Sequence, residues 1–392
     1  MDSFATLLQR NGMIFPNLKR SNFEIFRQLE AKKSGDMIGE KEKKIVFIID
    51  GMGWNLLQLA LKSYPDILEH NPYMKISKIH TIFPSTTMNV LPSLYSAMPT
   101  AQHGVVGTKL FMQQYGMTVN SIKMIPAGLN GQYGNIKPEL IFPRGRVVDT
   151  LKQKGKRVSI LSQEGLVNSA MTRATFDAED IIPVIGFEDM LVKARRLVKQ
   201  NGPEYIFGYN ELLDHAEHTY NYREEEPLEL LLSMLRSLDS ILLRHIKGSN
   251  YNLIITSDHG HIIVCANDLI KIDHSHTMME YLTMPPWGEG RAAFVDVKIK
   301  RKEEFEAYMK RKFSNSILVV DSDYAIKSGI FGAKKIKDNI RYRFGTHILL
   351  PKGNKHIHYV YPTNQYDTKV SAKLGVHGGL STDEIEIPLI LI

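Results

Sequence analysis

The chain has 392 residues, of which 43% are hydrophobic and 23% charged, so it is long and apolar enough to bury a large sheet in one elaborated domain. The formal net charge of +7 is spread along the chain among nearly as many acids, which disfavours a nucleic-acid-binding patch. A single cysteine, Cys265, excludes an intrachain disulfide and favours a cytoplasmic protein, and no apolar run approaches the roughly 18 residues of a membrane span.

The first 40 residues carry no motif that binds a metal or substrate. Within them, Phe23–Lys33 mixes apolar and charged residues in a way consistent with an amphipathic helix packed on the protein body. We therefore predict a helical extension over residues 1–40 and a main domain over residues 41–392.

Two apolar runs end in an aspartate. Asp50 follows Ile45–Ile49, and Asp258, with His259 beside it, follows Leu253–Ser257. Both runs predict buried parallel strands, whose carboxyl ends face the crevice where α/β proteins bind ligands. Taken alone, an aspartate at a strand end is more often a turn or cap residue.

Between these two runs lies a stretch of hydroxyl residues. Ser85, Thr86 and Thr87 precede a helix-like segment. A hydroxyl at a helix N-terminus meets unpaired N–H groups and the positive end of the helix dipole, which suit a phosphoryl oxygen. The alternative is an ordinary N-cap.

A third strand-like run, Tyr205–Tyr209, precedes Asp214 and His218. Their spacing of four places both side chains on one face of a helix. Near the end of the chain, His377 is followed by two glycines, which let backbone approach a metal or substrate closely, and then by the apolar stretch Ile385–Ile392.

The segment 262–345 is predicted to be a small α+β cap inserted between these motifs. It contains a predicted strand, Ala292–Ile299, and two predicted helices, Lys302–Arg311 and Asp321–Ser328. Caps of this kind shape substrate pockets. Arg291 is either a phosphate clamp or, as we favour, a solvated or salt-bridged arginine.

Three aspartates and three histidines form two sets of three protein ligands, which leaves open positions for water or substrate. By formal charge, two divalent ions against three carboxylates leave about one net positive charge, which attracts phosphate. The pattern therefore predicts an enzyme with a two-metal phosphoryl-transfer site. The six side chains are Asp50, Asp214, His218, Asp258, His259 and His377. With six ligands present, His261, His274 and His276 are expected to be exposed loop residues.

These motifs resemble the alkaline phosphatase superfamily, and most closely its type I phosphodiesterase and nucleotide pyrophosphatase branch. They occur in family order from about residue 44 to the C-terminus. The resemblance implies an α/β fold with a mostly parallel sheet and helices on both faces. The matching segments are Ile48–Trp54, Phe83–Thr87, His103–Gly104, Tyr209–His218, Thr256–Gly260 and His377–Glu384.

The resemblance also implies roles for single residues. Asp214, His218 and His377 would hold one metal, and Asp50, Asp258 and His259 the other. Alignment on Phe83–Pro84 and His103–Gly104 places the nucleophile at Thr87, with Thr86 as the alternative. Thr108 stands where the family has an asparagine that donates to the phosphoryl oxygen, and Tyr209 is either a base-stacking residue or a core aromatic.

The implied activity is hydrolysis of phosphodiester or pyrophosphate bonds in a small phosphate ester, possibly a nucleotide, through a phospho-threonine intermediate. The donor set favours zinc, with manganese as the alternative, and Glu217 or Asp273 are candidate partners for the second ring nitrogens of the histidines. A phosphomonoesterase, a phosphoglycerate mutase-like transferase and a non-catalytic binding relative stay open. The sequence indicates no oligomeric state.

Overall fold

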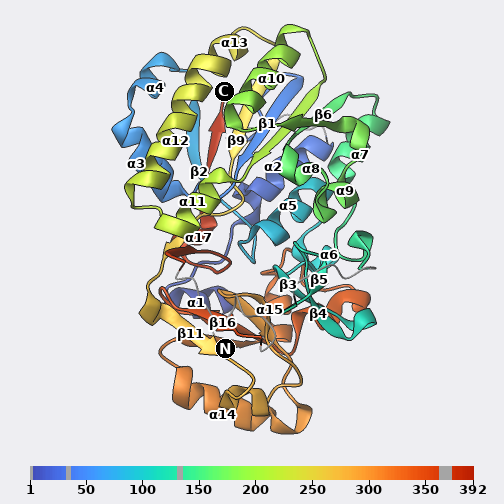
Figure 1. Ribbon diagram of the computed structural model, residues 1–392, viewed down its shortest axis with the longest axis vertical. Coiled ribbons are helices and arrows are strands. Elements are labelled where there is room, and N and C mark those ends of the chain that lie inside the picture. Colours follow the sequence, from blue (N-terminus) through green and yellow to red (C-terminus); the bar gives the residue numbers. More distant parts are fainter. Residues whose placement is uncertain (1–2, 32–36, 130–135, 362–372) are drawn as a thin grey trace.

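The computed structural model of the protein describes residues 3–31, 37–129, 136–361 and 373–392. Its strands form two seven-stranded sheets and two small two-stranded ones. Figure 1 shows a central sheet flanked by helices in the upper part of the molecule and a second sheet in the lower part. No helix in the described residues is long and apolar enough to cross a membrane.

The central sheet has the strand order β2-β18-β9-β1-β8-β6-β7. The five strands from β9 to β7 are parallel, and β18 runs antiparallel to both of its neighbours. This arrangement confirms the predicted α/β class with a mostly parallel sheet. The strands are β1 (Lys43–Ile49), β2 (Lys75–His80), β6 (Val158–Gln163), β7 (Ile181–Val184), β8 (Tyr205–Asn210), β9 (Tyr251–Thr256) and β18 (Glu386–Leu391).

Helices cover both faces of the central sheet, and the stretch Ile45–Ile49 of β1 is apolar for this reason. Ile45 and Phe47 pack into one core, whereas Val46 and Ile48 pack into the core on the opposite face. Successive strand residues point to opposite faces, so the part of a strand that is covered on both sides is mainly apolar. The first face carries α3 (Trp54–Ser63), α10 (Phe187–Lys199), α11 (Leu212–Tyr220) and α12 (Glu225–Leu238), and the second carries α2 (Asn22–Ala31), α5 (Thr87–Ser96) and α7 (Arg146–Gln153).

The N-terminal segment contributes α1 (Phe4–Arg10) and α2 to the body of the protein. Phe26 of α2 is fully buried against Phe207 of β8. The amide of Asn22 donates to the carbonyl oxygen of Ser257, at a distance of 2.9 Å, directly before Asp258. The expected amphipathic helix is thus present up to Ala31, and the last residues of the predicted stretch lie outside the described residues.

The second sheet has the order β14-β15-β13-β12-β3-β4-β5, and its neighbouring strands are antiparallel. It combines strands from the segment 262–345 with strands from residues 109–126 and 347–351, so the limits 262–345 remain a proposal. Its strands are β3 (Lys109–Met112), β4 (Met117–Asn120), β5 (Ile125–Pro126), β12 (Trp287–Glu289), β13 (Ala292–Val295), β14 (Ile317–Asp321) and β15 (His347–Pro351). Two helices lie where the sequence predicts them, α14 (Lys302–Phe313) and α15 (Ser322–Ser328).

Two small sheets connect the larger parts. In the first, β10 (Ile262–Ile263) pairs with β17 (Gly375–Val376), which brings the end of the chain beside the segment that follows β9. In the second, β11 (Leu269–Ile272) pairs with β16 (His356–Tyr359). The remaining short α-helices are α4 (Asp66–His70), α6 (Thr100–His103), α8 (Glu164–Val167), α9 (Ala170–Thr175), α13 (Arg244–Ile246) and α17 (Thr382–Ile385).

Candidate active site

The site lies at the carboxyl ends of three adjacent parallel strands. Asp50 follows β1, Asp258 follows β9, and Asp214 lies in α11, which begins just after β8. Because β8, β1 and β9 are neighbours in the sheet, their carboxyl ends meet at one edge. His377 joins them from the far end of the chain, because Val376 pairs with Ile262 across the β10–β17 sheet.

One group of donors consists of Asp50, Asp258 and His259, all of them buried. The Nε2 atom of His259 lies 3.4 Å from Asp50 Oδ1 and 3.4 Å from Asp258 Oδ2. Asp258 Oδ2 is buried and accepts no hydrogen bond within the described chain. A buried carboxylate oxygen without a partner is costly, and a cation would satisfy it.

The other group contains Asp214, His218 and His377. His218 Nε2 lies 3.6 Å from Asp214 Oδ2, and His377 Nε2 lies 3.5 Å from Asp214 Oδ1. Two ligands on a tetrahedral zinc ion with bonds of about 2.0–2.1 Å are separated by roughly 3.3–3.4 Å. The donor separations in both groups therefore fit a metal ion, and the structure brings all six sequence-predicted donors together in two sets of three.

A fourth histidine, His261, lies in the second of these groups. The expectation that it is an exposed loop residue is wrong, since only 1% of its surface is exposed. The apolar run Ile262–Val264 directly after it is the sequence signal that indicates burial. His274 is exposed as expected, and the half-buried His276 accepts a hydrogen bond from the backbone N–H of Met278.

The second ring nitrogens of the three predicted histidine ligands face backbone carbonyls. The Nδ1 atoms of His218, His259 and His377 lie 2.7, 3.3 and 3.3 Å from the carbonyl oxygens of Gly375, Gly260 and Ser85 respectively. A carbonyl can only accept, so each Nδ1 carries the hydrogen and each Nε2 lone pair faces the site. The prediction of Glu217 or Asp273 in this role is therefore wrong.

Burial and the neighbouring charges set the protonation of the site. Burial, followed by the carboxylates of Asp258 and Asp214, raises the pKa of Asp50 well above its ordinary value. Burial lowers the pKa of His218 to about 3 and that of His377 well below its ordinary value. His218 and His377 are thus neutral at pH 7, which is the form that binds metals, and the crowded carboxylates require positive charge beside them.

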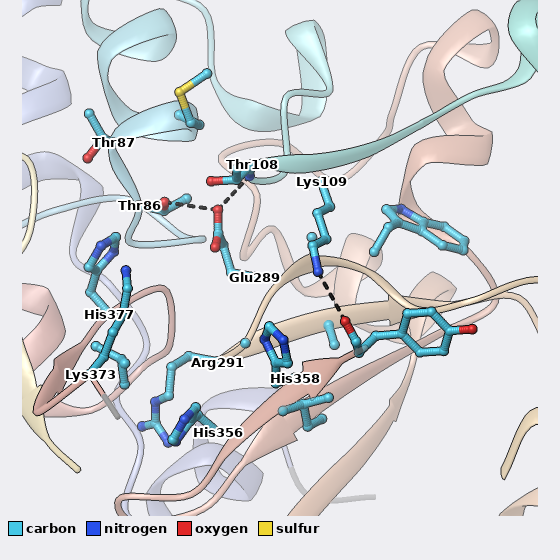
Figure 2. A pocket seen from close by; sticks show the side chains of 18 of the residues that line it. Thr86, Thr87, Thr108, Lys109, Glu289, Arg291, His356, His358, Lys373 and His377 are labelled. Carbon is cyan, nitrogen blue, oxygen red and sulfur yellow. Dashed lines mark hydrogen bonds between the residues drawn. The ribbon is translucent and has the colours of Figure 1, made fainter. Parts of the chain in front are cut away.

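The three hydroxyls at the start of α5 point in different directions. Thr87 Oγ1 lies 3.1 Å from His259 Nε2 and 3.3 Å from Asp50 Oδ2. Thr86 Oγ1 instead donates to Glu289 Oε1 at 3.2 Å, and Ser85 Oγ donates to the carbonyl of Gly379. Figure 2 shows the Thr86 hydroxyl turned toward Glu289, whereas Thr87 lies apart from that contact. Among the three, only the Thr87 hydroxyl contacts the predicted metal ligands.

The two predicted substrate residues lie on different sides of the site. The Tyr209 hydroxyl donates to Asp50 Oδ2, while its partly buried ring packs against the core that contains α2 and α5. Thr108 lines a pocket in front of Thr87, and its backbone N–H donates to Glu289 Oε1. Base stacking by Tyr209 and phosphoryl binding by Thr108 remain proposals.

The pocket has a volume of about 420 Å³ and extends from Thr87, Asp214 and His377 toward the second sheet. Figure 2 shows that its far wall is mainly basic. Glu289 is the acid of this wall, and its carboxylate already accepts from Thr86 and Thr108. The cationic or imidazole residues of the wall are Lys109, Arg291, His356 and His358, whereas Lys373 lies beside His377.

Arg291 is salt-bridged rather than free to clamp a phosphate. Its guanidinium donates to both carboxylate oxygens of Glu384, at 3.1 and 2.9 Å, and both side chains are almost fully buried. Glu384 also accepts from the backbone N–H of Gly379, two residues after His377. Burial alone would raise the pKa of Glu384, but Arg291 holds it below its ordinary value. The pair thus ties the loop that carries His377 to the second sheet.

We expect Arg291→Met to destabilise the protein by about 3–5 kcal/mol, because it leaves the Glu384 carboxylate buried and unpaired. Denaturant unfolding followed by fluorescence measures this change. The matched control is Arg27→Ala, which removes an exposed ion pair with Glu24 on the surface of α2 and should leave the midpoint nearly unchanged. Equal midpoints for Arg291→Met and the wild type would contradict the prediction.

A mostly parallel α/β sheet, with two clusters of aspartate and histidine beside a threonine at a helix N-terminus, defines a phosphoryl-transfer hydrolase of the alkaline phosphatase type. The sequence profile of the type I phosphodiesterase / nucleotide pyrophosphatase family matches residues 44–378, and the chain belongs to this family. It is a metal-dependent phosphoesterase, a hydrolase that acts on phosphoric ester bonds. The family resemblance predicted from the motifs is confirmed.

Solved structures share this fold. Murine ectonucleotide pyrophosphatase/phosphodiesterase 5 is 17% identical with a TM-score of 0.63, over 89% of this chain and 87% of that one. Phosphonoacetate hydrolase from Sinorhizobium meliloti 1021, in complex with phosphonoacetate, is 16% identical with a TM-score of 0.65, over 90% of this chain and 91% of that one. No curated protein sequence matches the chain.

Proposed function

We propose that the protein hydrolyses phosphodiester or pyrophosphate bonds of small anionic substrates, with Thr87 as the nucleophile. The observation that carries the proposal is the position of the Thr87 hydroxyl, which contacts both Asp50 and His259 and opens into the pocket. Asp214, His218 and His377 are proposed to hold one divalent ion, and Asp50, Asp258 and His259 the other. The equal mixture of imidazole and carboxylate donors favours zinc, with manganese as the alternative.

Two bound divalent ions would lower the pKa of an alcohol or a water and neutralise charge on phosphoryl oxygens. In the first half-reaction, Thr87 Oγ1 forms a bond to phosphorus while the bond from phosphorus to the leaving oxygen breaks. In the second, water attacks phosphorus, which still carries the substituent that did not leave, from the side opposite Thr87. The bond from phosphorus to Thr87 Oγ1 breaks, and a proton from the water restores the Thr87 hydroxyl. Two in-line displacements retain the configuration at phosphorus.

The backbone supports this chemistry because Thr87 is the first residue of α5. The first N–H groups of a helix have no carbonyl partner within the helix, and they lie at the positive end of its dipole. They are therefore available to phosphoryl oxygens at the point where the Thr87 alcohol attacks.

The basic wall of the pocket supports a substrate whose second substituent is also anionic. Lys109 lies on this wall, away from Thr87, whereas Lys373 lies beside His377. A pyrophosphate bond places a second charged phosphate in that direction. For comparison, an inactive murine ectonucleotide pyrophosphatase/phosphodiesterase 5 has been solved in complex with AMP, and it is 15% identical to this chain with a TM-score of 0.62.

The proposal is tested with p-nitrophenyl phosphate, bis-p-nitrophenyl phosphate and the p-nitrophenyl ester of thymidine monophosphate, each with zinc or manganese. Faster cleavage of the two diesters supports it. Faster cleavage of the monoester would overturn the substrate class in favour of a phosphomonoesterase or a phosphotransferase. A purified protein that binds no metal and cleaves none of the three would be a binding relative.

We expect Lys109→Met to raise the KM for a dinucleoside pyrophosphate by roughly 10-fold, because it removes a charged hydrogen-bond donor from the wall. The KM for bis-p-nitrophenyl phosphate, whose second substituent is uncharged, should change much less. Lys335→Met, which removes an exposed lysine outside the pocket, is the matched control. Equal changes for both substrates would show that the wall does not recognise a second charge.

A further inference from the structure

His261 stands out because it is a buried polar residue that the proposed mechanism does not use. It lies between β9 and β10, with 1% of its surface exposed. Its ring centroid lies 4.8 Å from that of His218, 4.9 Å from that of His377 and 5.4 Å from that of His259. The imidazoles of His218, His261 and His377 thus lie within 3.6 Å of the Asp214 carboxylate.

The distances to Asp214 separate two roles that His261 could have. His218 and His377 lie 3.6 and 3.5 Å from the Asp214 oxygens, which is the separation of two ligands on one ion. His261 Nε2 lies only 2.8 Å from Asp214 Oδ1, which is the length of a hydrogen bond. Two ligands of one tetrahedral ion would not approach so closely.

We infer that His261 is a positioning residue, not a fourth ligand, and this inference rests on the proposed metal site. Its Nε2–H donates to Asp214 Oδ1 and holds the carboxylate so that Oδ2 faces His218. Hydrogen bonds of this kind fix the orientation of a ligating carboxylate and raise metal affinity. The first ion then keeps three protein ligands and an open position for water or substrate.

The experiment is a titration of metal-free protein with zinc in competition with a chromophoric chelator, together with metal analysis at saturation. His261→Ala removes the donor, whereas His261→Gln keeps an amide N–H at a similar reach. His218→Ala removes a proposed ligand, and His274→Ala removes an exposed histidine as the control. Thermal unfolding of each metal-free variant measures the stability of its fold.

We expect His261→Ala to bind two ions at saturation, one of them about 10–100-fold more weakly than in the wild type. His261→Gln should restore most of that affinity, whereas His218→Ala should lose one ion. If His261→Gln loses one ion as His218→Ala does, His261 is a ligand and the inference is wrong. Wild-type affinity in His261→Ala would also overturn it.

The two proposals fail in distinguishable ways. A wild-type protein that binds no zinc would refute the metal site itself. If the wild type binds two ions and His261→Ala binds them with the same affinity, only the role of His261 is refuted. If His261→Ala does not fold, the comparison of His261→Gln with His218→Ala decides between hydrogen-bond donor and ligand.

Discussion

Thr87→Ala is expected to lower kcat by at least about 1,000-fold while the protein still binds two metal ions. The reason is that Thr87 is the one hydroxyl of the Ser85–Thr87 run that contacts Asp50 and His259. Steady-state rates with a nitrophenyl diester measure the loss. Rapid acid quenching of the wild type followed by mass spectrometry should detect one nitrophenyl phosphoryl group on the peptide that contains Thr87, because the second ester bond is retained in the intermediate.

Thr86→Ala is the matched control for this variant. Its hydroxyl donates to Glu289 and does not cap α5, so its loss should reduce kcat by less than about 10-fold. An inactive Thr86→Ala beside an active Thr87→Ala would move the nucleophile to Thr86. Full activity of Thr87→Ala, with no phosphorylated peptide in the wild type, would remove covalent catalysis from the mechanism.

Removal of the metal ions is expected to lower activity to below about 1% of its original value, with recovery on addition of zinc or manganese. Without cations, Asp50, Asp214 and Asp258 crowd together in a buried site, so removal should also lower the melting temperature. Dialysis against a chelator, followed by activity assays and calorimetry across added metals, measures both effects.

Asp50→Asn tests whether this recovery depends on the proposed ligands. It removes a carboxylate at almost constant volume, so added zinc should not restore its activity. Lys335→Met, on an exposed segment outside the pocket, should lose and recover activity as the wild type does. Activity that survives complete metal removal in the wild type would contradict a metal-dependent mechanism.

The sequence predicts the parts of the site that depend on local order along the chain. Asp50 and Asp258 each end an apolar run, and strands buried on both faces are apolar throughout. The helical spacing of Asp214 and His218 is equally local. Parallel strands that are neighbours in a sheet have their carboxyl ends at one edge. The residues that follow these strands therefore converge there.

Other features depend on contacts between distant segments and have no local signal. The second sheet joins β3 from the first third of the chain to β12 through Lys109 and Gly288. Arg291, between β12 and β13, pairs with Glu384, which lies far from it in the sequence. The expectation that His261 is exposed is wrong because it rests on the count of six ligands that complete the metal site. A buried histidine that only donates a hydrogen bond needs no vacant ligand position.

The position of β18 has a consequence for synthesis of the protein. This strand, Glu386–Leu391, is inserted between β2 and β9, and β2 has no other strand partner in the described residues. While the ribosome is still translating the preceding residues, β2 and β9 expose unpaired edges that can pair with other chains. We therefore expect a chain that lacks residues 386–391 to be prone to aggregation.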